Sequence, residues 1–167
     1  MHHKVEERHP RPDAVTCTGV PIVQPSHGMG SWTTGLCGCF EDFTNCCITC
    51  WCPCVTFGQN AEIIDRGKIS CVRAGMVCYS LGHFTFHAIY TCTYRSKLRG
   101  QYSIPGDQCA DFCIHCWCPF CAFCQEHREL VNRGLDPSMG WVTNRETQNR
   151  QIGMTVAPAS QQGMTRT

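Results

Sequence analysis

Cysteine is the residue type whose number and spacing in this chain could support chemistry. The 167 residues include 17 Cys, a share far above ordinary usage, and all but Cys17 lie between Cys37 and Cys124. Thiolates are soft ligands that favour Zn²⁺, Cd²⁺ or Cu⁺. Two dense blocks supply the candidate metal ligands, which are Cys46, Cys47, Cys50, Cys52 and Cys54, followed by Cys113, Cys116, Cys118, Cys121 and Cys124.

The spacing within each block suits a metal ion. Cys46, Cys50 and Cys54 recur every four residues, which would align their sulfurs along one helix face. Pairs separated by two residues, such as Cys113 and Cys116, allow two thiolates to reach one tetrahedral ion. Two other uses remain open, because such thiols also serve as small buried or redox side chains and as lipid attachment sites near membranes.

A second group of residues could relay a metal ion. His83 and His87 stand four residues apart in a charge-free stretch, a spacing that lets two imidazoles share one ion. His115 lies inside the second Cys block, and Glu62 and Glu129 follow the two blocks. Satisfied core histidines and solvated helix faces are the competing interpretations. The segment at residues 37–39 precedes two acidic residues and could add metal ligands, but we interpret it as a solvated turn.

Composition and motifs exclude several functions. The net charge is +1 with no long basic run, so we expect no nucleic-acid partner. No nucleophile elbow, phosphate-binding loop or dinucleotide fingerprint occurs, so we expect neither an enzyme nor an organic cofactor. The N-terminal segment is polar and resembles no signal peptide. We therefore expect thiols that face a reducing cytosol or lie within a membrane.

An internal repeat would position these residues. Residues 47–53 match residues 113–119, and the match resumes after one inserted residue. Each unit, 42–67 and 107–134, reads as a Cys-rich apolar segment, a Pro, and an amphipathic helix that ends at Arg-Gly. The aligned downstream pairs are Gln59 with Glu126, Glu62 with Glu129, Ile63 with Leu130, Arg66 with Arg133, and Gly67 with Gly134.

Three stretches lack charged residues altogether: 43–61, 74–94 and 112–125. The first two are long enough to cross a bilayer, which takes about 20 residues, although their hydrophobicity is weak. Pro53 and Pro119 should kink the Cys-rich helices. We predict an all-α, Cys-rich membrane domain over residues 32–141, with two kinked helical units around a central hydrophobic helix. Residues 1–31 and 142–167 are expected to be flexible tails.

The motif Cys-Cys-x-x-x-x-Cys-Pro-Cys at residues 46–54 resembles the placenta-specific-8 domain. Residues 32–37, 94–102, 125–130, 132–134 and 140–141 resemble other blocks of that family. The plant cadmium-resistance proteins and the fruit-weight or cell-number regulators are its similar members. The resemblance implies a plasma-membrane protein with two hydrophobic segments that self-associates, and places the motif on Cys46, Cys47, Cys52, Pro53 and Cys54.

Three hypotheses for function follow. The first is heavy-metal tolerance, with Zn²⁺ or Cd²⁺ bound or exported by a homo-oligomer at the plasma membrane. The second is a membrane scaffold that restrains cell number or organ size without transport. The third is a soluble zinc-bound module.

Overall fold

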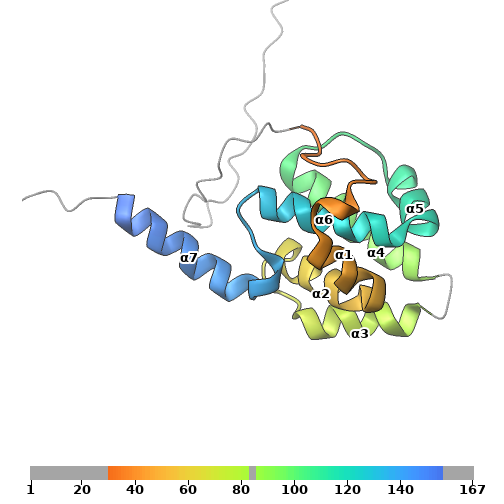
Figure 1. Ribbon diagram of the computed structural model, residues 1–167, viewed down its shortest axis with the longest axis horizontal. Helices are drawn as coiled ribbons and strands as arrows, with labels where there is room; N and C mark the ends of the chain where they lie inside the picture. The colour runs from red at the N-terminus through yellow and green to blue at the C-terminus, as the bar shows by residue number, and fades with distance from the viewer. Residues whose placement is uncertain (1–29, 83–85, 156–167) are drawn as a thin grey trace, which may run out of the picture.

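The computed structural model describes residues 30–82 and 86–155, which form helices and connecting turns without any strand (Figure 1). The all-α prediction is confirmed. The α-helices are α1 (Phe43–Trp51), α2 (Pro53–Ile64), α3 (Cys71–Leu81), α4 (Phe86–Tyr102), α5 (Gln108–Trp117), α6 (Pro119–Asn132) and α7 (Gly140–Thr155). Two 3-10 helices, η1 (Cys39–Glu41) and η2 (Pro137–Met139), precede α1 and α7.

Both repeat units form a helix, a break and a second helix. Pro53 and Pro119 stand at the first position of α2 and α6, where a missing N–H is tolerated. A residue before Pro is disfavoured in the helical conformation. Cys52 and Cys118 leave it in nearly the same way, with φ/ψ of −138°/68° and −137°/55°. The expected kinks are therefore full interruptions of the helix.

Both units end in a left-handed turn that contains a Gly. Gly67 and Gly134 adopt positive φ angles of 74° and 80° just beyond α2 and α6. This left-handed conformation is accessible to Gly at little cost and closes a helix C-terminus. In the second unit, the Leu135 N–H after Gly134 donates to the Leu130 carbonyl (3.0 Å). In the first unit, the equivalent closing bond runs from the Gly67 N–H to the Glu62 carbonyl (2.8 Å), and it follows Arg66, whose φ is also positive at 55°.

The predicted central hydrophobic helix is wrong in one respect, because the chain forms two helices there. Helix α3 ends at Leu81 and α4 begins at Phe86. The Gly82 N–H donates to the carbonyls of Cys78 and Tyr79, which closes α3. The first charge-free stretch is likewise divided at Cys52. Among the helices of residues 30–82 and 86–155, none combines the length and apolar character needed to traverse a bilayer.

The core is centred on the Phe57 ring of α2, which is fully buried. Its centroid lies 5.5 Å from that of Tyr90, 5.2 Å from that of Tyr94 and 5.5 Å from that of Phe123. These rings come from α2, α4 and α6. Edge-on and tilted aromatic contacts of this kind add to the stabilisation from area burial alone.

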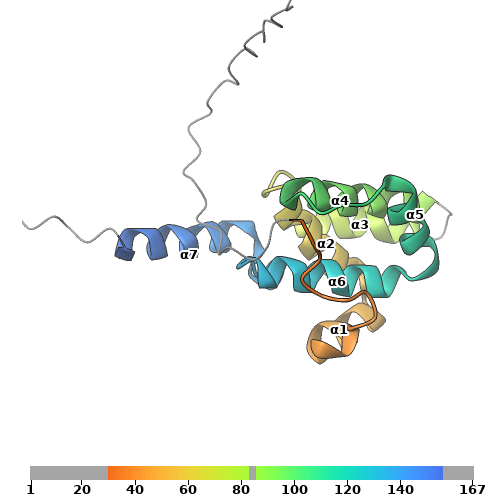
Figure 2. The ribbon, with the colours of Figure 1, turned by 90° about the horizontal axis from the view of Figure 1, so that it is seen from above.

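Helix α6 is buried on its polar side as well as on its apolar side. Within Gln125–Leu130 every residue is buried. Residues 31–41 form a strap that runs along α6 toward α1 (Figure 2). Gln125 donates to the Thr34 carbonyl (2.8 Å) and Arg128 donates to the Gly35 carbonyl (2.8 Å). The Trp32 ring covers the Arg95 guanidinium at 4.1 Å. The strap thus closes the domain over α6.

The expectation of a tail without structure from residue 142 needs correcting, because α7 continues to Thr155. Figures 1 and 2 show α7 extending away from the other helices. Its start is fixed by contacts from elsewhere in the chain. The Trp141 N–H donates to Glu62 Oε1 (3.0 Å), and the Asn144 amide bonds with Asp136 and Gly140. The composition of residues 142–155 could not reveal these contacts.

Close packing of α2 against α3 generates a stability prediction. A Cβ added at Gly58 would clash with the backbone carbonyl oxygen of Cys71, whereas one at Gly100 in α4 would meet nothing within 4 Å. Gly58→Ala should lower the free energy of unfolding by about 1–3 kcal/mol through overpacking. Gly100→Ala should be neutral or stabilising by up to about 1 kcal/mol, because Ala favours the helix. Urea unfolding of both variants tests this, and equal stabilities would contradict it.

Candidate functional site

Five thiols from three separate segments are neighbours and form what we call the thiol cluster. Its members are Cys39 of η1, Cys46 and Cys50 of α1, and Cys121 and Cys124 of α6. Burial raises the pKa of Cys46 to about 11, and the nearby thiols of Cys124, Cys39 and Cys50 raise it further in that order. Burial also raises the pKa of Cys121, with further contributions from Cys39, Cys118, Cys37 and Cys124 in that order.

Cys124 has the most varied surroundings in the cluster. Burial raises the pKa of its thiol, while the hydrogen-bonding Thr49 hydroxyl lowers it. Cys39 and Cys50 raise that pKa, and the Arg128 guanidinium lowers it. Arg128 is thus the cationic group that would favour a thiolate here. The cluster therefore combines protonated thiols with one buried positive charge.

Helix α1 is oriented by contacts at both of its ends. Asp42 caps it by accepting from the Asn45 N–H (2.9 Å). Across the break, the Thr49 and Thr56 hydroxyls are 2.9 Å apart, and Thr49 also donates to the Asn45 carbonyl (2.7 Å). Figure 2 shows α1 lying beside α6, on the side away from α3 and α4. Cys46 is buried and has Cys124 of α6 as a neighbour.

The first thiol of the cluster is positioned by Arg128. Its guanidinium donates to Glu41 Oε2 at 2.6 Å, and the ion pair places η1 against α6. Gly38 permits this approach, since a Cβ there would lie 2.7 Å from Arg128 Nη1. Cys39 follows directly. The turn at residues 37–39 therefore supplies a thiol, that of Cys39, that lies near thiols of both Cys blocks.

The thiols do not yet adopt a coordination geometry. In the part of the chain that the structure describes, no three Cys, His, Asp or Glu side chains converge closely enough to hold a metal ion. Thiols with raised pKa values are protonated near neutral pH. Metal binding at the cluster would therefore require both proton loss and side-chain rotation.

The other predicted Cys ligands lie outside the cluster. Cys54 at the start of α2 adjoins Cys78 of α3, and burial together with Cys54 raises the pKa of Cys78. Cys52 and Cys118 are exposed at the two breaks. Cys47 is half-buried, and Cys113 and Cys116 are exposed on α5.

The predicted histidines fall into different surroundings. His115 is buried, and its Nε2 lies 3.1 Å from Glu126 Oε1. Glu126 also pairs with Arg95 at 3.4 Å, so His115 belongs to a buried ionic network rather than to the thiol cluster. His87 is half-buried against the Phe123 ring, and its pKa is lowered by burial and by His115. His83 lies outside the described residues.

The two predicted acidic residues both bind protein groups. Glu62 accepts from the N–H of Cys71 (2.8 Å) and of Trp141 (3.0 Å), at the starts of α3 and α7. Carboxylates are stabilising at helix N-termini. Glu129 is fully buried, accepts from Thr33 N–H (2.7 Å) and pairs with Arg133. Both residues thus connect segments that are distant in sequence.

Comparison with known proteins settles the relationship of the chain. Residues 32–129, more than half of its length, match the PLAC8 family. The chain belongs to the PLAC8 family. Among PLAC8 relatives, Cell number regulator 7 of Zea mays is 49% identical over 157 residues, covering 89% of this chain and 87% of that protein. Protein PLANT CADMIUM RESISTANCE 2 of Arabidopsis thaliana is 51% identical over 142 residues, covering 84% and 93%.

The resemblance found in the sequence is therefore confirmed. Cell number regulator 4 of Zea mays is a third relative, 53% identical over 116 residues, covering 66% of this chain and 73% of that protein. These names describe regulators and resistance proteins rather than enzymes. No solved structure matches the chain.

The raised pKa of Cys46 predicts slow alkylation. Because the thiolate is the nucleophile, iodoacetamide should modify Cys46 of the metal-free protein slowly at pH 8 and faster as the pH approaches 11. Exposed Cys109 is the internal reference. Peptide mapping by mass spectrometry measures both sites. Equal labelling rates at pH 8 in the folded protein would refute the prediction, and labelling in urea checks that both peptides are detected.

Proposed function

We propose that this protein binds soft divalent ions, Zn²⁺ or Cd²⁺, through the thiol cluster, and so supports heavy-metal tolerance at the plasma membrane. One observation carries the proposal: Cys39, Cys46 and Cys124 are neighbours although they come from three separate segments. If these positions served only to fill the core, apolar side chains such as Ala or Val would serve equally well. Five adjacent thiols exceed by one the four ligands of a tetrahedral site.

The surroundings of the cluster suit a thiolate site. Four thiolates around a divalent cation leave a net negative charge, which is costly to bury without a partner. Arg128 lies next to Cys124 and lowers the pKa of its thiol. Cys50 is exposed while Cys46 and Cys124 are buried, so ions have access from one side. We propose Cys39, Cys46, Cys50 and Cys124 as the four ligands, with Cys121 as a fifth thiol nearby.

Export of the ion by a homo-oligomer would be a further step beyond binding. The relatives named for cadmium resistance support a role in metal tolerance, which either sequestration or export would provide. Measuring cellular cadmium separates the two, because export lowers the content of the cell and sequestration does not.

A second candidate is a scaffold that restrains cell number. It is supported by relatives named as cell number regulators at comparable identity. The structure also carries exposed apolar side chains, among them Trp51, Trp117 and Phe43, that a partner could cover. Under this hypothesis the thiols would bind structural zinc, and cadmium tolerance would not depend on them.

Loss of Cys39 tests the cluster as a metal site. Cys39→Ser and Cys124→Ser should each lower Cd²⁺ affinity at least about tenfold. Cys109→Ser should retain wild-type affinity, since Cys109 is exposed at the start of α5. Metal content of the purified full chain and Cd²⁺ titration provide the measurements. Wild-type affinity in both cluster variants would refute the proposed site.

A cell assay separates tolerance from binding. Yeast that produces the wild-type chain should tolerate more Cd²⁺ than yeast that produces Cys39→Ser, at equal protein abundance. If the variant loses Cd²⁺ in vitro yet still protects the cells, the role in tolerance is wrong. The scaffold hypothesis then gains support if overproduction still restrains cell number.

Proton release provides a test that does not depend on variants. Since raised pKa values keep Cys46 and Cys124 protonated near pH 7, each must lose a proton to bind the ion. The apparent affinity for Cd²⁺ should therefore rise with pH between 6 and 8. Calorimetry in buffers of different ionisation enthalpy counts the protons. Affinity that does not change with pH would contradict thiol ligation.

A further inference from the structure

The two helix breaks present the same exposed sequence, a Trp followed by a Cys and a Pro. Trp51 is 88% exposed and Trp117 is 85% exposed. Cys52 and Cys118 directly follow them and are also exposed. Neither thiol is among the proposed metal ligands, although Cys118 lies near Cys121. An exposed indole beside an accessible thiol therefore occurs twice, at equivalent positions of the repeat.

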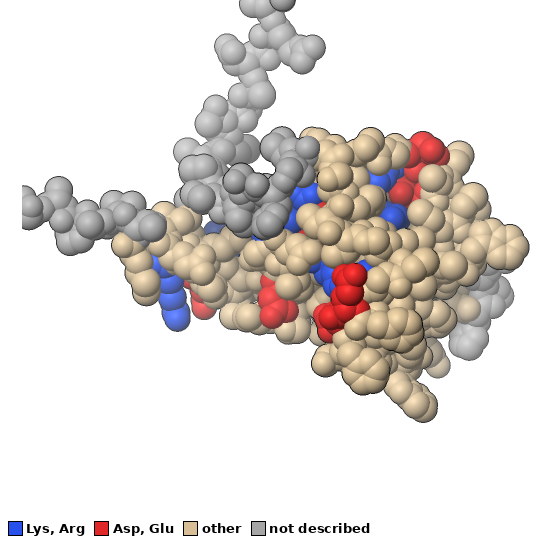
Figure 3. All heavy atoms as spheres, turned by 45° about the horizontal axis from the view of Figure 1, so that its top comes forward, with Lys and Arg blue, Asp and Glu red and all other residues tan. Residues whose placement is uncertain are grey.

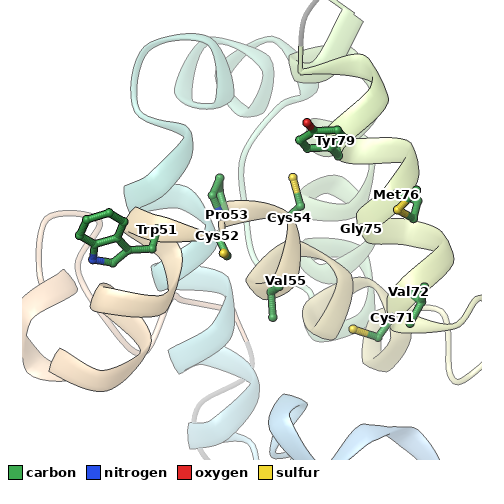
Figure 4. Close-up of a pocket in the computed structure, with 10 residues that line it drawn as sticks. All are labelled: Trp51, Cys52, Pro53, Cys54, Val55, Cys71, Val72, Gly75, Met76 and Tyr79. Atoms are coloured by element: carbon green, nitrogen blue, oxygen red, sulfur yellow. The ribbon is translucent and has the colours of Figure 1, made fainter.

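The first break opens onto an apolar groove of about 610 Å³. Figure 4 shows its walls, with the break segment Trp51–Val55 on one side and α3 on the other. The α3 wall includes Val72, Met76 and Tyr79. Gly75 lets α3 pack closely against α2, because an added Cβ would lie 2.8 Å from the Cys54 carbonyl oxygen. Cys52 itself lines the groove. A chain attached to the Cys52 sulfur would thus start inside it.

The second break adjoins the same surface. A neighbouring pocket of about 360 Å³ shares Pro53, Cys54 and Tyr79 with the groove, and its far side is formed by Pro119 and Phe120. The two breaks, distant in sequence, therefore border one continuous apolar surface.

Charged side chains are excluded from this surface. Neither lining contains Asp, Glu, Lys or Arg. On the face shown in Figure 3, the tip of the lower lobe carries no Lys, Arg, Asp or Glu. Such a surface suits hydrocarbon, and exposed indoles are well suited to the boundary between hydrocarbon and water. The polar side-chain groups of the two linings are limited to Cys thiols, the Trp51 indole, the Tyr79 hydroxyl and the His87 imidazole.

We propose that Cys52 and Cys118 are S-acylated with long-chain fatty acyl groups, and that the chain on Cys52 occupies the groove when the protein is away from a membrane. The donor is a long-chain acyl-coenzyme A. The Cys sulfur attacks the thioester carbonyl carbon and forms a new carbon–sulfur bond. The bond to coenzyme A breaks, and its thiolate takes up the proton that the Cys thiol loses. No oxidation or reduction occurs.

Two acylation sites fit the need for stable attachment. One acyl chain gives only marginal, reversible membrane binding, whereas two chains anchor a protein. The repeat supplies two equivalent sites, each with a Trp that would lie at the membrane surface. This inference rests on the proposed membrane location, but it is independent of the proposed metal site because it uses different thiols.

Acyl exchange on the full chain produced in plant cells tests the proposal. Free thiols are blocked, hydroxylamine cleaves thioesters, and the released thiols are mapped by mass spectrometry. Hydroxylamine-dependent thiols should appear at Cys52 and Cys118. Cys52→Ser and Cys118→Ser should each lose one site, and Cys109→Ser should lose none. Absence of hydroxylamine-dependent thiols at both positions, or equal labelling of Cys109, would overturn the proposal.

Membrane attachment gives a second readout. The wild-type chain should remain in the membrane pellet after an alkaline wash, and the double variant Cys52→Ser/Cys118→Ser should be released. Retention of the double variant would overturn the anchoring role.

Unmodified protein from bacteria distinguishes other occupants of the groove. It should be monomeric and bind phosphatidylcholine vesicles at least tenfold more weakly than the acylated protein. A dimer that protects Met76 from oxidation would instead assign the groove to a second copy and overturn the proposal. The double variant should still bind Cd²⁺ with wild-type stoichiometry, which shows that it folds. A failure of acylation is thereby distinguished from a failure of the metal site.

Discussion

Burial of the polar side of α6 is the constraint on which the rest of the domain depends. Glu126 and Glu129 are fully buried, and an unpaired buried carboxylate would be severely destabilising. Glu126 is paired by Arg95 from α4, and Glu129 by Arg133 and the Thr33 N–H. Asp111 of α5 joins the same network through Arg95 and Arg99. The positions of α4, α5 and the strap follow from these pairings.

The thiol cluster results from the ion pairs along α6 together with the two helix breaks. Arg128 extends the polar side of α6 and draws in Glu41, which positions η1 and Cys39. The break at Cys52 frees α1 from the axis of α2, so that Cys46 lies near Cys124 of α6. Thiols from both repeat units lie near one another because Arg128 of α6 pairs with Glu41 of the N-terminal strap. The exposed thiols at the breaks are left for different chemistry.

Local signals in the sequence predicted much of this arrangement. Pro53 and Pro119 indicated the breaks, Gly67 and Gly134 indicated the helix ends, and the repeat indicated two equivalent units. The division of the central stretch, the course of α7 and the part played by Cys39 depend on contacts between distant residues. Gly38, for example, is informative only once Arg128 is known to lie beside it. A buried ion pair such as Arg95 with Glu126 produces no recognisable pattern in the sequence of either helix.

Glu62 and Glu129 occupy equivalent positions in the two repeat units but bind different partners. The first joins the starts of α3 and α7, and the second holds the strap and Arg133. Two identical copies of one unit could not meet both demands at once. The halves have therefore become complementary, and exchanging them or replacing one by the other would leave a carboxylate without its partners. The two repeat units are therefore similar in sequence but not interchangeable in the folded protein.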